Sequence, residues 1–380
     1  MASVMKSSLA LLSAVLCFWC SGSVLAHDVA EHLDPELITG WRTWVHLTIQ
    51  WTHLAAFALW LGLTFGVILL GIEAPLDHLL YPSWILFLIS FATGTYNMEW
   101  SAGISETPSV FLLPLLERIP YAVTYTLALA AKLALFVAAI LFTLAVTLLR
   151  LRRRANEQRQ RKIFLTYGAL LVVSITLTAS VVLYYHEVAD LWPTPLHSQG
   201  GVMGPDGPRG QPVTAPQEPP NDFSHLASGD AWIDIGLRWL HLLGFGLWLG
   251  GGAWALCFSG VSAARYLLLS WALVALQIVS GVASMARWTP FYVPPYIWNI
   301  SELSAIRFAR SYTLFMAAKH LLIAFALVFL TVWTVRYWKA GEMTQLTIRP
   351  LAAVNVLLAL AVGYIMMIVL LLHEGVDHAL

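Results

Sequence analysis

Long apolar stretches separated by short polar ones dominate the chain. Eight of them approach the roughly 20 residues that an α-helix needs to cross a bilayer. They lie near 42–70, 82–98, 121–149, 163–185, 231–257, 266–286, 312–336 and 351–372. The pattern therefore predicts an all-α polytopic membrane protein with eight transmembrane helices.

Composition excludes a soluble globular protein. Of the 380 residues, 59% are hydrophobic and only 11% are charged, whereas soluble domains carry about 25% charged residues. Acidic and basic residues number 21 each, so net charge gives no reason to expect nucleic acid as a partner. The lipid bilayer is the expected environment.

The first 26 residues have the pattern of a cleavable signal peptide. Lys6 precedes a short apolar run, and small residues end at Ala26. Cleavage there would leave a mature chain that begins at His27 and keeps Cys257 as its single cysteine. Neither an internal disulfide nor a cysteine-based metal site is then expected.

A proline- and glycine-rich stretch divides the remaining chain. Its composition is typical of a linker rather than of a membrane helix. The predicted parts are a first four-helix repeat over 27–186, an external linker over 187–230 and a second four-helix repeat over 231–380.

Basic residues predict the orientation. Seven of them lie between the third and fourth segments, namely Arg150, Arg152, Arg153, Arg154, Arg159, Arg161 and Lys162. Cytoplasmic loops are enriched in Lys and Arg. We therefore expect this loop in the cytoplasm, both termini in the periplasm, and the protein in a bacterial inner membrane.

The two halves repeat each other. Trp51-Thr52-His53-Leu54 aligns with Trp239-Leu240-His241-Leu242, and after a one-residue slip Ala130-Ala131-Lys132 aligns with Ala317-Ala318-Lys319. Because each half has an even number of spans, the repeats are expected to be parallel and related by an axis along the membrane normal.

A resemblance to a known family rests on the second half. His241-Leu242 followed by Leu247 to Gly251, with an Ala-Ala-Lys helix farther on, is similar to the membrane domain of copper-resistance protein D. The chain also resembles, more distantly, the membrane-type haem-binding protoporphyrinogen oxidase. The resemblance implies periplasmic copper handling or haem binding.

Three intramembrane histidines are the main candidate ligands. His53, His241 and His320 are expected at similar depth, roughly 12–17 Å below the outer surface at 1.5 Å per residue. Ionisable side chains within a bilayer are costly and are functional candidates. Either His241 and His320 face one haem iron, or the equivalent His53 and His241 share one site; packing against a backbone carbonyl or a tryptophan is the alternative to both.

Cations near these histidines are candidates for holding haem propionates. Lys132 and Lys319 would reach outward for this purpose, unless they pair with Glu187 and Glu374 at the outer helix ends. For Arg238, a cation one turn before His241, the alternative is an ion pair with Asp234.

Further histidines are candidate metal ligands at the outer side: His46, His186, His373 and His27. The glycine pairs Gly62/Gly66 and Gly246/Gly250 predict close helix packing or, beside the histidines, room for a flat macrocycle. Soft sulfur ligands for Cu(I) are few near the histidines, chiefly Met316.

The sequence favours a b-type haem protein that moves electrons between a quinol or periplasmic donor and a partner. Copper uptake or homeostasis is the second hypothesis and a haem-dependent membrane oxidase the third. Quinol, a periplasmic cytochrome or a copper protein are the expected partners, with membership of a larger membrane complex possible. No nucleophile–base set or phosphate loop is present, so hydrolases and ATPases are set aside. An electron-transfer or metal-handling membrane protein is favoured over a stand-alone enzyme.

Overall fold

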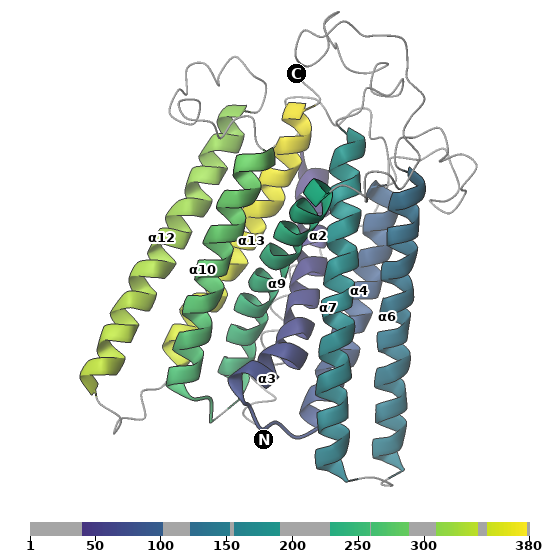
Figure 1. Ribbon diagram of the computed structural model, residues 1–380, viewed down its shortest axis with the longest axis vertical. Coiled ribbons are helices and arrows are strands. Elements are labelled where there is room, and N and C mark those ends of the chain that lie inside the picture. Colours follow the sequence, from purple (N-terminus) through teal and green to yellow (C-terminus); the bar gives the residue numbers. More distant parts are fainter. Residues whose placement is uncertain are drawn as a thin grey trace, which may run out of the picture.

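The computed structural model describes residues 40–101, 122–152, 156–190, 229–258, 260–288, 309–340 and 348–377. Within these ranges the chain is all-α, and eight helices are long and apolar enough to cross a membrane. The predicted fold class is confirmed for the part of the chain that is described. The helices run alternately up and down as one bundle (Figure 1).

Each half contributes four long helices. The first half contains α2 (Trp41–Leu61), the π-helix η3 (Gly62–Gly66), α3 (Val67–Leu70), α4 (Asp77–Ser101), α6 (Ala122–Leu151) and α7 (Glu157–Asp190). The second half contains α9 (Gly229–Cys257), α10 (Ala263–Trp288), α12 (Ala309–Ala340) and α13 (Arg349–Asp377).

Several helix boundaries differ from the sequence prediction. The helix α4 begins at Asp77, more than one turn before Pro82, which lies inside the helix. Asp77 favours a helix start because its charge complements the helix dipole, and Arg150 of α6 binds both of its carboxylate oxygens at 3.1 Å. The helices α7 and α9 also extend a few residues into the predicted linker 187–230.

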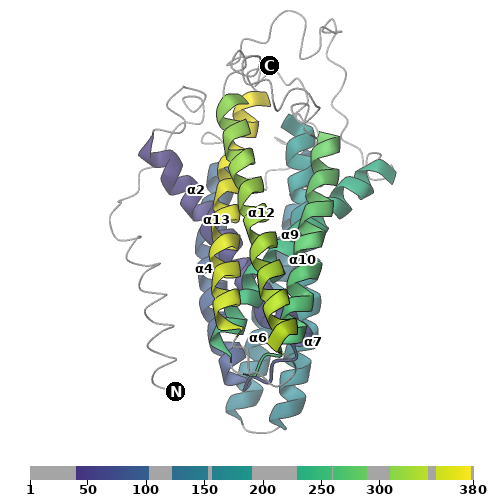
Figure 2. The same ribbon diagram turned by 90° about the vertical axis from the view of Figure 1, so that its left-hand side faces the viewer.

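The first helix of each repeat lies at the centre of the bundle. There α2 packs against α9, while α6 and α12 lie at opposite sides (Figure 1). The fourth helices connect the repeats, since α7 packs against α9 and α13 packs against α2 (Figure 2 gives the second view).

Side-chain clusters show that these cross-repeat contacts are equivalent. Ile235 of α9 shares a cluster with Tyr185 of α7, and the matching residue Leu47 of α2 shares one with Leu372 of α13. The internal duplication seen in the sequence is therefore present in the packing as well.

Glycines make the central crossing possible. A Cβ placed on Gly62 would overlap the backbone of Gly250, and one placed on Gly250 would overlap Ala58 and lie 2.8 Å from the Cα of Gly62. A Cβ placed on Gly246 would likewise lie 2.6 Å from Cδ2 of Leu61. Of the two interpretations of these glycines, close helix packing is confirmed, because the opposite helix fills the space that a macrocycle would need.

Charged side chains tie the helix connections together at one end of the bundle. Arg150 contacts Glu157 at 3.1 Å, and Arg161 donates to the carbonyl oxygen of Ile72. The guanidinium of Arg265 lies against Gly71, which adopts a positive φ of 65° where α3 ends. The same end carries the basic residues that predict the cytoplasmic side.

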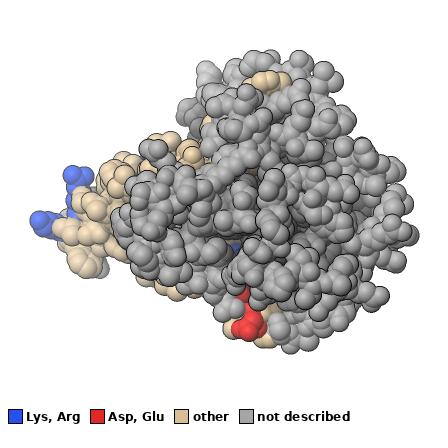
Figure 3. Space-filling view, turned by 90° about the horizontal axis from the view of Figure 1, so that it is seen from above, with Lys and Arg blue, Asp and Glu red and all other residues tan. Residues whose placement is uncertain are grey.

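Figure 3 shows the molecule from the opposite end. Seen from the end at which α13 finishes, Lys and Arg atoms appear at one edge and Asp or Glu atoms at another (Figure 3).

Candidate functional site

The imidazoles of His53 and His241 have the same hydrogen-bond partner type in the two repeats. His53 Nδ1 lies 3.0 Å from the Oγ1 of Thr93 on α4. His241 Nδ1 lies 3.0 Å from the Oγ of Ser280 on α10. Both hydroxyls are buried, with 2% and 1% of their residue surfaces exposed. Each repeat thus holds a half-buried imidazole paired with a buried hydroxyl between its first and second helices.

The hydroxyl protons determine which ring nitrogen carries a hydrogen. Thr93 donates to the carbonyl oxygen of Ile89 at 2.7 Å, and Ser280 donates to that of Leu276 at 2.6 Å. A hydroxyl has only one proton, so it accepts the hydrogen bond from the ring. Nδ1 is therefore the donor, and the neutral imidazole keeps an unprotonated Nε2 as a potential ligand.

A glycine follows each hydroxyl residue and lets the ring approach the helix. A Cβ on Gly94 would lie 3.1 Å from Cε1 of His53, and one on Gly281 would lie 3.3 Å from Cε1 of His241. Such distances are tighter than ordinary van der Waals contact. Thr-Gly and Ser-Gly are therefore the second part of the repeated site.

These hydroxyl–glycine pairs were not predicted from the sequence. Thr93-Gly94 and Ser280-Gly281 align with each other under the same one-residue slip that aligns Lys132 with Lys319. Applying that alignment to every polar residue of the second and sixth spans would have found the pair. Individually, a Thr or Ser inside a membrane helix more often bonds its own backbone.

In each repeat a lysine of the third helix interacts electrostatically with the histidine. Lys132 of α6 lies within electrostatic range of His53, and Lys319 of α12 within that of His241. Lys319 is 7% exposed, and its Nζ lies 3.7 Å from Sδ of Met366 on α13. Among the described residues neither lysine has a carboxylate partner.

The remaining predicted residues lie elsewhere in the bundle. His320 follows Lys319 on α12, is half-buried, and contacts the backbone of Met316 one turn before it. His46 is buried on α2, with its ring centroid 6.0 Å from that of Tyr96. Their ligand roles stay predictions.

The roles of Arg238 and of the outer histidines stay predictions. Arg238 is half-buried on α9, one turn after the buried Asp234. His27 lies outside the described residues, as do the side chains of His186, His373, Glu187 and Glu374 at the ends of α7 and α13.

Donor residues are dispersed rather than clustered. In the described ranges no three His, Cys, Asp or Glu side chains are grouped as a metal site. Cys257, the cysteine that the structure describes, is exposed and unpaired. Any metal held by the intramembrane histidines would therefore be bound by isolated imidazoles, as haem iron is.

Comparisons with protein-family models, with curated proteins and with solved structures gave no match.

Proposed function

We propose that each four-helix repeat binds one b-type haem, with Nε2 of His53 and Nε2 of His241 as iron ligands. The protein would then carry electrons across part of the bilayer between a quinol or periplasmic donor and a partner protein. The observation that carries this proposal is the repeated imidazole–hydroxyl pair, His53–Thr93 and His241–Ser280.

The pair has the chemistry of an oriented metal ligand. Histidines that bind metals usually donate their other ring N–H to a nearby acceptor, which fixes the ring and the tautomer. Both imidazoles meet this requirement through Nδ1. A bound haem supplies a one-electron carrier, and this chain's part is to hold the iron, exclude water and balance the charge of the propionates.

The lysines fit the charge of the proposed ligand. Among the described side chains Lys319 is buried without a carboxylate partner, which is unfavourable in a low-dielectric region. A carboxylate that enters with the ligand would offset this cost near Lys132 and Lys319. Lysine near each histidine therefore supports an anionic ligand over a bare cation.

Two separate sites fit the geometry better than one shared site. The ring of His53 bonds to α4, whereas that of His241 bonds to α10. These two helices lie on opposite sides of the central α2–α9 pair (Figure 1). His320 remains a candidate for the second iron ligand in the second repeat.

Copper handling is the competing function. The contact between Lys319 and Met366 bears on it in two ways. Met366 offers a thioether of the kind that Cu(I) prefers, and the resemblance to copper-resistance protein D implies copper. However, the ammonium of Lys319 lies 3.7 Å from that sulfur, and a fixed cation repels a second one. A haem-dependent oxidase is the third hypothesis.

The proposal also includes the location. The basic end of the bundle would face the cytoplasm of a bacterial cell and both termini the periplasm, with the protein acting alone or within a larger membrane complex.

Substitutions of Lys319 distinguish haem from copper. We expect Lys319→Arg to keep the haem and Lys319→Met to lower haem occupancy or shift its reduction potential, because a propionate would lose its counter-charge. The measurement is haem and copper content per chain in both variants and in the parent. Unchanged haem together with increased copper in Lys319→Met would contradict the haem proposal and support copper.

Loss of the hydroxyl tests its orienting role. We expect Ser280→Ala and Thr93→Ala to speed haem loss to excess apomyoglobin by about 10–100-fold, the usual effect of removing a partner that orients a metal ligand. Ser280→Thr and Thr93→Ser keep a hydroxyl and serve as matched controls. Equal rates in the alanine variants and their controls would show that the hydroxyls do not orient the ligands.

A further inference from the structure

Two equivalent tryptophans leave a buried N–H group without an acceptor. Trp60 of α2 aligns with Trp248 of α9, and they are 3% and 4% exposed. The indole Nε1 of each has no hydrogen-bond partner among the described residues. A buried donor without an acceptor is unfavourable. Here an indole N–H without a described acceptor occurs at the equivalent position of both repeats.

Other indoles show that this fold can satisfy such groups. Trp84 donates to Thr147 at 3.3 Å and the equivalent Trp271 donates to Thr334 at 3.0 Å. Trp254 donates to the carbonyl oxygen of Leu59 at 2.8 Å. The indole nitrogens of Trp239 and Trp333 also lack a described acceptor, but they do not occupy equivalent positions of the two repeats as Trp60 and Trp248 do.

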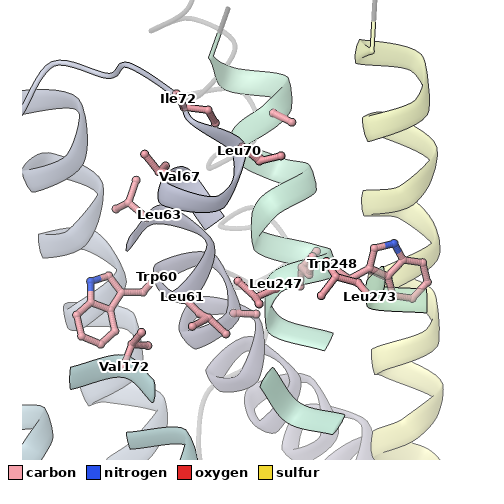
Figure 4. Packing of buried hydrophobic residues seen from close by; sticks show 14 of the residues in the cluster. Trp60, Leu61, Leu63, Val67, Leu70, Ile72, Val172, Leu247, Trp248 and Leu273 are labelled. Atoms are coloured by element: carbon pink, nitrogen blue, oxygen red, sulfur yellow. The ribbon is translucent and has the colours of Figure 1, made fainter. Parts of the chain in front are cut away.

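Each of these indoles lies on the same helix face as the histidine of its repeat. Trp60 follows His53 by two helical turns, as Trp248 follows His241, which places each tryptophan about 10 Å farther along the helix. The two indoles point to opposite sides of the α2–α9 pair (Figure 4). They therefore lie on opposite sides of the central helix pair, within the same core cluster.

The indole of Trp60 lies among aromatic side chains. Its ring packs edge-on against Phe87 of α4, at 4.8 Å between centroids, and against Phe57 at 6.4 Å. A buried water needs about two to four polar partners, which these aromatic neighbours do not provide. An apolar ligand that carries its own acceptor would suit these aromatic walls.

We propose that Trp60 and Trp248 each donate a hydrogen bond to a carbonyl oxygen of a quinone, one bound in each repeat. A quinone head group is flat and apolar and carries carbonyl acceptors, which match an indole N–H among phenylalanines. The inference deepens the proposed function by identifying quinone as the electron-transfer partner. Binding itself does not require that haem be present.

The test measures, by calorimetry, the binding of menadione, a short quinone, to the purified full-length protein in detergent. We expect two sites in the parent, with affinity lowered about tenfold at one site in Trp60→Phe and at the other in Trp248→Phe. Trp338→Phe is the matched control, because Trp338 of α12 is 75% exposed. No binding to the parent, or unchanged affinity in both buried variants, would overturn the inference.

A second measurement needs no variant. The compound 2-methylnaphthalene has the ring system of menadione without its carbonyl groups. We expect it to bind the parent protein at least about tenfold more weakly than menadione does. Equal affinity would show that no N–H donation occurs. Haem content measured in the same preparation keeps the proposals separate: quinone binding without haem rejects only the haem proposal, and haem without quinone binding rejects only this inference.

Discussion

Replacing His241 with alanine is expected to remove about half of the haem bound to the protein, and replacing His53 is expected to remove the other half. Each imidazole is the proposed ligand of a separate iron, and alanine offers no donor atom in its place. Both rings are held by hydroxyls on different helices, so the two losses should be independent. The double variant should then contain almost no haem. The haem-to-protein ratio of purified variants provides the measurement.

His78→Ala is the matched control for these variants. His78 lies at the start of α4, is exposed, and is distant along that helix from Thr93. We expect it to keep the haem content of the parent. If either intramembrane variant alone removed all haem, one shared site would replace the two proposed here; full haem content in both would reject these histidines as ligands.

The central glycine crossing should tolerate no methyl group. We expect Gly250→Ala to lower the free energy of unfolding by about 1–3 kcal/mol or more, as overpacking does. Its Cβ would meet the backbone of Ala58 and Gly62, and backbone atoms cannot rotate aside as a flexible side chain can. Thermal unfolding of the detergent-solubilised protein would show this as a lower midpoint.

Gly236→Ala gives the same chemical change on the same helix. Nothing lies within 4 Å of a Cβ at Gly236, so the helix preference of alanine over glycine, about 1 kcal/mol, should leave stability equal or slightly raised. Matching midpoints for the Gly250 and Gly236 variants would contradict the close crossing of α2 and α9.

Much of the fold could be predicted from the sequence because membrane helices obey a simple length and polarity rule. All eight spans, their alternation and the internal repeat follow from apolar runs and from aligned residues such as His53 with His241. The contacts that the fourth helices make with the other repeat could not be predicted. Contacts such as Tyr185 with Ile235 depend on which face of a uniformly apolar helix meets its neighbour, and hydrophobicity does not encode that choice.

The candidate site was predictable only in part. Histidine and lysine stand out inside a membrane because burying them is costly. Thr93 and Ser280 do not stand out, since a hydroxyl inside a helix is readily satisfied by the carbonyl one turn before it. Their role appears only once α4 lies beside α2 and α10 lies beside α9. The indoles of Trp60 and Trp248, which lack an acceptor among the described residues, likewise become apparent only in the folded structure. In the sequence, a tryptophan within an apolar run indicates only a residue that packs in the core.

The reduced-minus-oxidised optical spectrum of the purified parent protein, taken with its haem and copper content, tests the central claim most directly. The account predicts a b-type spectrum with about two haems per chain and little copper. Copper without haem, or a protein that binds neither, would contradict it.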